Sequence, residues 1–141
     1  MKPAKNGKMT PLAAGKAVIT IKASGNEEYK AKTIKVKAEV FPKKPAQVKK
    51  VKAVPSKAKR TAKVTWKKTS ASGYQIQYAY SKKVSKGKMI KAPKGKSVSK
   101  TIKKLKSRKY MYVRVRAYTA KAGLTSYGKW SKTARSRKKI R

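Results

Sequence analysis

Aromatic and arginine side chains concentrate in one stretch of the sequence, and they have the clearest chemical use. Tyrosine and arginine alternate along one segment, and further aromatic residues follow it: Tyr110, Tyr112, Arg114, Arg116, Tyr118, Tyr127 and Trp130. Because alternate residues of a strand share one face, these side chains should lie together on an outward surface. On such a surface rings stack on bases or sugars, and guanidinium groups hold phosphate or sulfate. Alternatively, the rings and guanidinium groups stack on one another as an internal ladder.

Positive charge is the second feature that could bind a ligand. The 141 residues include 43 Lys or Arg and only 3 acidic residues, which makes a formal net charge of +40. Such a field attracts polyanions, and it also opposes folding through self-repulsion. Most of the cations are lysines, which suit diffuse attraction better than base-specific contacts. We therefore expect anionic polymers as partners.

The cations expected to contact such a polymer lie near the aromatic cluster and at the end of the chain. They are Lys103, Lys104, Lys106, Arg108, Lys109, Arg114, Arg116, Arg135, Arg137, Lys138 and Lys139. Residues 135–141 are expected to be frayed and available, because chain termini are seldom held by the fold. The aromatic residues expected to act as platform or ladder are Tyr112, Tyr118, Tyr127 and Trp130.

Most residue types that enzymes and metal sites need are missing. The sequence has no Cys, no His and no Asp, and its acids are Glu27, Glu28 and Glu39. Thiolate or imidazole metal sites, disulfides and nucleophilic relays through His are therefore excluded. We expect no enzyme activity and no cofactor. No apolar run approaches the roughly 20 residues that span a bilayer.

Alternation of apolar and basic residues predicts strands throughout the chain, since a period of two is typical of half-buried strands. Residues 17–22 and 33–40 read as an antiparallel pair. Pro42 and Pro45 interrupt the pattern, and we place the boundary between a first module, residues 1–45, and a second, residues 46–141. Seven short strands in the second module suggest an all-β sandwich. They are residues 48–54, 62–67, 73–81, 88–92, 97–103, 110–119 and 132–138.

The residues of the second module resemble a fibronectin type III domain. Trp66 resembles the family's buried tryptophan, and Tyr74, Ile76 and Tyr78 resemble its third strand. The residues that resemble the leucine before the sixth strand and that strand's inward positions are Leu105, Val113, Val115 and Ala117. The resemblance implies a seven-stranded fibronectin type III-like sandwich, preceded here by an additional N-terminal β-hairpin. The family's tyrosine-corner position falls on Met111, with Tyr110 and Tyr112 beside it.

Three further likenesses concern source and detail. The Lys-rich second module, with Tyr-Val-Arg-Val-Arg-Ala-Tyr at 112–118 and Tyr-Gly-Lys-Trp-Ser at 127–131, resembles modules repeated in Gram-positive bacterial surface proteins, which implies an extracellular, non-enzymatic adhesin or spacer. Residues 15–41 look like the closing hairpin of a bacterial immunoglobulin-like domain. The segment 127–131 resembles the Trp-Ser-x-Trp-Ser element of class I cytokine receptors, which implies that Arg114 and Arg116 stack on Trp130.

The sequence therefore favours a non-catalytic, strongly cationic surface or secreted module that binds polyanions by salt-sensitive electrostatics. Nucleic acid, teichoic acid, lipopolysaccharide and sulfated glycan are the candidate ligands. One alternative is a structural spacer or adhesion repeat with a protein partner. Another is an engineered or intracellular nucleic-acid-condensing protein, because the sequence starts at Met1 with no apolar signal segment. We expect the protein at the cell surface or outside the cell, as a fragment or processed chain. A cytoplasmic location is the alternative, because the sequence has no signal peptide.

Overall fold

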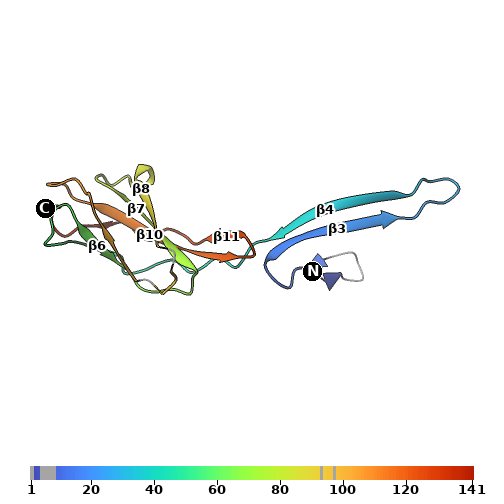
Figure 1. The fold of residues 1–141 in the computed structure, drawn as a ribbon, viewed down its shortest axis with the longest axis horizontal. Coiled ribbons are helices and arrows are strands. Elements are labelled where there is room, and N and C mark those ends of the chain that lie inside the picture. The colour runs from blue at the N-terminus through green and yellow to red at the C-terminus, as the bar shows by residue number, and fades with distance from the viewer. Residues whose placement is uncertain (1, 4–8, 93, 97) are drawn as a thin grey trace. The chain divides into compact units, whose positions relative to one another are not determined.

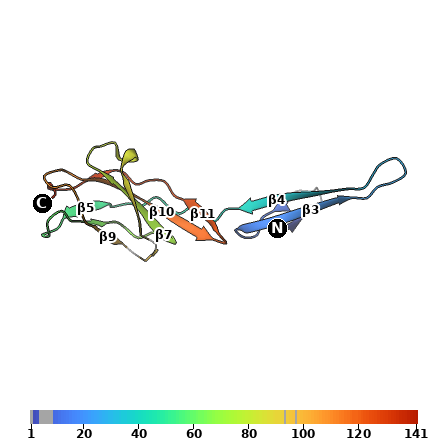
Figure 2. The same cartoon turned by 45° about the horizontal axis from the view of Figure 1, so that its top comes forward.

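The structure is a computed structural model that describes residues 2–3, 9–92, 94–96 and 98–141 (Figures 1 and 2). The chain folds as two compact units. Unit 1 comprises Met1–Pro42 with Ala120–Thr125, and unit 2 comprises Lys43–Thr119 with Ser126–Arg141. The prediction that independent modules meet between residues 45 and 46 stays a prediction.

Unit 1 is built on a long antiparallel hairpin. Its strands are β1 (Lys2–Pro3), paired with β2 (Met9–Thr10), and β3 (Gly15–Ala23), paired with β4 (Lys32–Val40). Ile21 lies opposite Ile34, so both side chains share one face, yet they are 50% and 46% exposed. On the other face Lys16 Nζ lies 3.4 Å from the Glu39 carboxylate. A two-stranded ribbon has too little apolar area to cover its own face.

Unit 2 is a two-layer antiparallel sandwich. One layer has the strand order β5-β6-β9, and the other has the order β11-β10-β7-β8, with β12 paired to β10 as well. The strands are β5 (Lys52–Pro55), β6 (Ala62–Thr65), β7 (Gly73–Ala79), β8 (Lys88–Ala92), β9 (Ser99–Ile102), β10 (Tyr112–Lys121), β11 (Leu124–Tyr127) and β12 (Ala134–Arg135). A single turn of 3-10 helix, η1 (Val84–Lys86), precedes β8.

The hydrophobic core lies between the two sheets of unit 2. Val64 from β6 and Ile76 from β7 are fully buried, as is Val115 from β10. Alternation of apolar and polar residues in β10 therefore sends Val115 inward and leaves its neighbours Arg114 and Arg116 on the outer face. The Trp66 ring, just past β6, packs 5.2 Å from the Tyr74 ring across the sandwich. The all-β expectation is confirmed.

The last predicted strand is too long, and a strand before it was not predicted. Residues 132–138 were expected to form the last strand, but β12 is only Ala134–Arg135, and β11 occupies Leu124–Tyr127, where a loop was expected. Ala122 and Gly123 have φ of 51° and 73°, so the chain reverses in a tight turn and returns directly beside β10. The two segments together take the place of one strand.

Serine side chains explain why the pairing of β10 with the chain after β11 is irregular. The Ser131 hydroxyl accepts the Val115 N–H at 3.0 Å, and the Ser136 hydroxyl accepts the Met111 N–H at 3.0 Å. Each serine thus replaces a main-chain carbonyl as the acceptor for β10. Both serines are buried, so these contacts hold the edge of the sheet out of water.

Three strand starts in unit 2 also differ from the prediction, and one of them is that of β10, which begins at Tyr112 rather than at residue 110. β5 begins at Lys52 rather than at residue 48, because Lys50 has a φ of 55°, which interrupts extended backbone. Residue 97, the expected start of the strand over 97–103, lies outside the described residues, and β9 runs from Ser99.

Met111 fills the position that the resemblance assigns to the corner tyrosine, and its side chain is fully buried in the core. The loop after Leu105 is instead tied by Tyr80 at the end of β7. The Tyr80 hydroxyl accepts the Lys106 N–H at 2.9 Å. A tyrosine from a different strand thus provides the hydrogen bond at that corner.

Residues 135–141 are held by the fold, contrary to the expectation of a frayed end. Ile140 is 2% exposed and lies in the core. Its N–H donates to the Lys109 carbonyl at 2.9 Å, and its own carbonyl accepts the Arg108 N–H at 2.7 Å. The Arg141 carbonyl accepts the Arg60 N–H at 2.7 Å. An apolar residue among the cations anchors the segment, since burying it is favourable.

Candidate functional site

The aromatic and arginine cluster on the outer face of β10 forms an internal ladder. The Arg114 and Arg116 guanidinium carbons each lie 4.5 Å from the centroid of the Trp130 ring. Arg116 also lies 4.2 Å from the Tyr127 ring, which packs 6.0 Å from the Tyr118 ring. The stacking of Arg114 and Arg116 on Trp130 agrees with the expectation. These contacts place a guanidinium over both the Trp130 and the Tyr127 rings, while Tyr127 remains 37% exposed.

Two buried glutamines hold the ladder arginines from the neighbouring strand β7. The Arg114 Nε and Nη2 donate to Gln77 Oε1 at 3.0 and 2.8 Å, and the Arg116 Nε donates to Gln75 Oε1 at 2.9 Å. The Gln77 amide nitrogen donates in turn to the Ser85 carbonyl at 2.9 Å. Sequence reasoning missed both glutamines. The signal that could have found them is their place on the polar face of a strand that pairs with β10.

Arg116 is partly buried within the ladder. Partial burial lowers the pKa of Arg116 from its usual value, Tyr127 acts in the opposite direction, and Arg114 lowers it further. An arginine stays charged at any physiological pH. The ladder is therefore a row of cations stacked on rings and bonded to neutral amides.

The remaining predicted ring is separate from the ladder. Tyr112 is paired with Arg135 where β10 pairs with β12, and among the described residues no ring stacks on Tyr112. Tyr110, just before β10, lies under two cations instead. The Arg135 guanidinium carbon lies 4.7 Å from its centroid, and Lys139 Nζ lies 5.9 Å from it. Arg135 and Lys139 thus form a second cation–π group, which lies closer to residue 141 in the sequence than Arg114 and Arg116 do.

The predicted cations near the corner after β9 are all exposed. They are Lys103, Lys104, Lys106, Arg108 and Lys109. Lys106 lies 5.8 Å over the Tyr80 ring. Lys104 and Arg108 have φ of 57° and 60°, a left-handed conformation that long side chains seldom adopt. Arg137 and Lys138 are exposed on the final segment.

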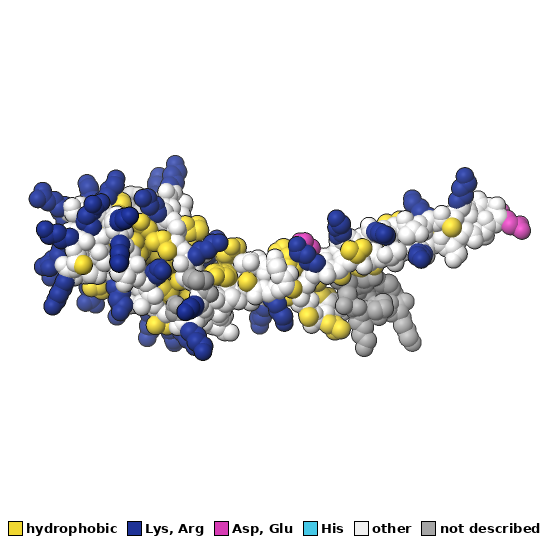
Figure 3. All heavy atoms as spheres, in the orientation of Figure 1, with side chains coloured by type: hydrophobic (Ala, Val, Ile, Leu, Met, Phe, Trp, Pro, Cys, Tyr) yellow, Lys and Arg dark blue, Asp and Glu magenta, His cyan; other side chains and the backbone are white. Residues whose placement is uncertain are grey.

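Unit 2 holds its cations without any carboxylate side chain. Residues 46–141 contain 32 Lys or Arg and no Asp or Glu. The one side-chain ion pair among the described residues, Lys16–Glu39, belongs to unit 1. Figure 3 shows lysine and arginine side chains spread around unit 2 on the visible face. The positive charge of unit 2 must therefore be neutralised by solvent ions or by an external anion.

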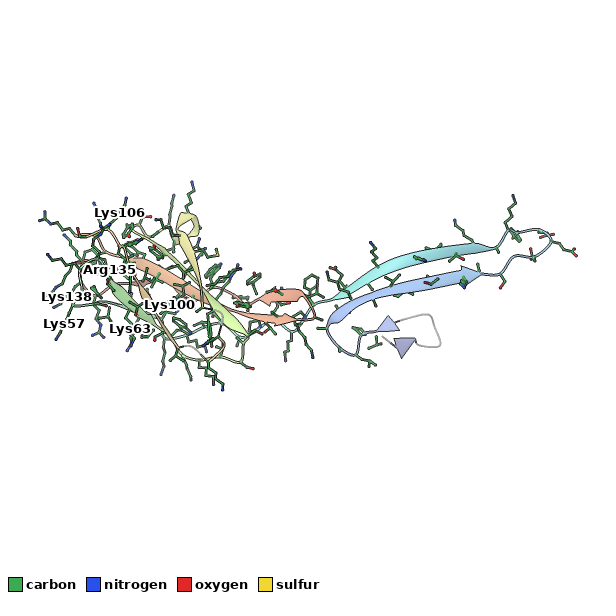
Figure 4. The ribbon with its side chains drawn as sticks, viewed as in Figure 1. Lys57, Lys63, Lys100, Lys106, Arg135 and Lys138 are labelled. Atoms are coloured by element: carbon green, nitrogen blue, oxygen red, sulfur yellow. The ribbon has the colours of Figure 1, made fainter. Side chains whose placement is uncertain are left out.

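Further exposed cations lie on the three-stranded layer and its turns, outside the set proposed as contact residues. Figure 4 shows Lys57, Lys63 and Lys100 on unit 2 together with Arg135 and Lys138. Lys100 lies opposite Val64, which is buried, so an exposed lysine occupies the inner side of the edge strand β9. An inward-pointing charge on an edge strand opposes pairing with another chain.

Metal ligands and membrane-spanning helices also bear on the kind of site. No cluster of three or more metal-ligating His, Cys, Asp or Glu side chains occurs within the described part of the chain. No helix among those residues is long and apolar enough to cross a membrane.

Comparison with solved structures identifies the fold of unit 2 as fibronectin type III-like. An Fn3-like protein from Clostridium thermocellum is 18% identical, with a TM-score of 0.51 over 70% of this chain and 94% of its own. The FN5 domain of Drosophila Lar is 20% identical, with a TM-score of 0.50 over 68% and 96% of the two chains.

A third structure, the FN1-FN3 domains of chicken CNTN1, is 21% identical with a TM-score of 0.59. The match covers 94% of this chain and 45% of that one. No protein-family model and no curated protein sequence matches the chain. At these identities the likeness shows the fold alone.

Proposed function

We propose that residues 46–141 form a non-catalytic module that binds anionic polymers through its cationic surface. The observation that carries the proposal is the complete absence of carboxylate side chains from a segment with 32 Lys or Arg. A polymer that neutralises these charges releases its condensed counterions, which drives association. Such binding depends on charge density and hardly on sequence.

The internal ladder favours binding through charge rather than through recognition of nucleic-acid bases. Tyr127 and Trp130 stack on Arg116, and Tyr118 packs on Tyr127. The Arg116 guanidinium covers one face of the Tyr127 and Trp130 rings, so the ladder offers less open ring surface than the aromatic faces on which single-strand binding modules stack bases. Teichoic acid, lipopolysaccharide and sulfated glycan thus fit this surface better than a base-stacked nucleic acid. The contact residues proposed from the sequence at 103–109 and 135–139 remain candidates.

Exposure on, or release from, a bacterial cell fits this proposal, since the anionic glycopolymers named above are components of cell surfaces. We also propose that residues 15–41 are the closing hairpin of an immunoglobulin-like domain. The exposed Ile21 and Ile34 support this, because a complete domain would cover that face.

The test compares dextran sulfate with uncharged dextran of matched length by fluorescence anisotropy, from about 50 to about 500 mM salt. We expect binding of dextran sulfate only, with log affinity falling linearly as log salt rises. Affinity that is unchanged at high salt, or equal binding of both dextrans, would contradict the proposal. A protein captured with weak salt dependence would instead support the spacer or adhesion repeat.

A further inference from the structure

A groove in unit 2 runs between the end of β5 and the final segment of the chain. Its volume is about 490 Å³, and it is lined mainly by Val54, Pro55, Ser56, Lys57, Arg137, Lys138, Lys139 and Arg141. Five of these residues are cations, and none is aromatic or acidic. Figure 4 shows Lys57 and Lys138 close together at the end of unit 2 that carries the C-terminus. The residues come from segments about eighty positions apart, so only the fold assembles them.

Hydrogen bonds hold both walls of the groove. On one wall the Ser56 N–H donates to the Thr61 carbonyl at 2.9 Å, which closes the turn after β5. On the other wall the Arg137 N–H donates to the Ala53 carbonyl at 3.4 Å, and buried Ile140 fixes the segment to the core. Cations on held backbone lose less freedom on binding than cations on mobile loops.

The guanidinium groups of the groove are uncommitted. Four of the seven arginines have partners within the domain: Arg60 donates to the Leu105 carbonyl at 2.8 Å, Arg114 and Arg116 donate to glutamines, and Arg135 stacks on Tyr110. No side-chain partner occurs for Arg108, Arg137 or Arg141 within the described residues. Two of these three line the groove. A free guanidinium offers the paired donors that hold phosphate or sulfate oxygens in a bidentate fashion.

We infer that this groove is the primary contact for a sulfated or phosphorylated glycan chain, an inference that rests on the proposed function. The apolar floor of Val54 and Pro55 suits the carbon face of a sugar chain, since Val54 is 45% exposed. Arg137 and Arg141 bind the ester oxygens, and Lys57 with Lys138 neutralises neighbouring groups. Because no ring lines the groove, it has no surface on which bases stack.

The experiment measures binding of two short probes, a heparin oligosaccharide for sulfate and a glycerol phosphate oligomer for phosphate, by the intact chain. The double variant Arg137→Gln/Arg141→Gln is compared with Lys68→Gln/Lys91→Gln, which removes the same charge from exposed positions outside the groove. We expect at least about a tenfold loss of affinity for the groove variant and less than about a threefold loss for the control. The charge-preserving variant Arg137→Lys/Arg141→Lys should lose affinity by an intermediate factor, because lysine lacks the paired donors.

The outcomes separate the groove from the general proposal. Equal losses in the two Gln variants, with dextran sulfate still bound by the unaltered protein, would overturn the groove and leave polyanion binding intact. Failure of the unaltered protein to bind dextran sulfate would overturn both. A single-stranded oligonucleotide that binds as tightly as heparin, and depends equally on Arg137 and Arg141, would overturn the glycan assignment. Circular dichroism confirms that each variant folds.

Discussion

The Arg116 guanidinium carbon lies 4.5 Å from the centroid of the Trp130 ring, and the same guanidinium stacks 4.2 Å from Tyr127. One arginine thus fills the space between two rings of the neighbouring segment. Each of these stacks contributes about 0.5 to 2 kcal/mol, depending on how much water is excluded. The arrangement binds the irregular edge after β11 to the outer face of β10, which points away from the hydrophobic core.

Replacing Trp130 with alanine should remove the centre of the ladder. We expect the free energy of unfolding to fall by about 1 to 3 kcal/mol, because Arg114 and Arg116 both lose a ring partner. Chemical denaturation measures this free energy, and the dependence of the unfolding free energy on denaturant concentration (the m value) should stay unchanged. Lys129→Ala, one residue earlier and exposed, should change stability by less than about 0.5 kcal/mol. An equally stable Trp130→Ala protein would mean that the ladder carries no energy.

Replacing Ser136 with alanine should destabilise the edge formed by β12. The Met111 N–H would lose its acceptor and the Lys138 carbonyl its donor, while the site stays buried. An unsatisfied buried group costs about 1 to 3 kcal/mol. Ser107→Ala, at an exposed position, is the matched control. Similar thermal unfolding of the two variants would contradict the role given to the Ser136 hydroxyl.

Tyr78 should make stability fall at alkaline pH. Burial, with a smaller contribution from Tyr80, raises the pKa of Tyr78 above its usual 10.0. The unfolded chain therefore ionises at this residue first, and the stability that neutral Tyr78 provides is lost as pH rises from 10 through the raised pKa. Tyr78→Phe lacks this dependence.

The measurement is the difference in unfolding free energy between the unaltered protein and Tyr78→Phe at several pH values from 8 upward. The difference should be constant below pH 10 and then fall by up to about 1.4 kcal/mol per pH unit. Titration of the lysines occurs in both proteins and cancels. A difference that stays constant across the whole range would show that Tyr78 is solvated in the folded state.

Salt should stabilise unit 2, because the 32 Lys or Arg of residues 46–141 repel one another and no carboxylate side chain lies among them. Raising sodium chloride from about 20 to about 300 mM shortens the Debye length from about 20 Å to about 6 Å. We expect the melting temperature to rise by several degrees over this range. Dextran sulfate at low salt should produce a similar rise through binding to the folded state. A melting temperature unaffected by either would mean that the repulsion is unimportant.

Local patterning was sufficient for much of the fold. Alternation placed Val64, Ile76 and Val115 inside and predicted β8 at its observed bounds, Lys88–Ala92. It failed where a residue departs from extended backbone. Lys50, with a φ of 55°, shortens β5, and the turn at Ala122 and Gly123 creates β11 where a loop was expected. Neither effect follows from hydrophobic period, because turn geometry depends on single dihedral angles.

The ladder was only partly foreseeable. Stacking of Arg114 and Arg116 on Trp130 followed from a local sequence likeness, whereas their hydrogen bonds to Gln77 and Gln75 depend on the pairing register of β7 with β10. That register joins residues almost forty positions apart. Nothing in the local sequence around either glutamine specifies it.

By itself, the sequence determined the all-β character of the chain and its excess of positive charge. Residue alternation is visible in neighbouring residues, and net charge is a sum over all residues, so neither requires the tertiary structure. Tertiary structure alone decided which cations meet. It brought Lys57 beside Arg137 and Arg141 in one groove, and it anchored that segment through Ile140 rather than leaving it free. The reason is that contacts between distant segments form only when burial of the shared core outweighs the entropy of closing the long loops between them.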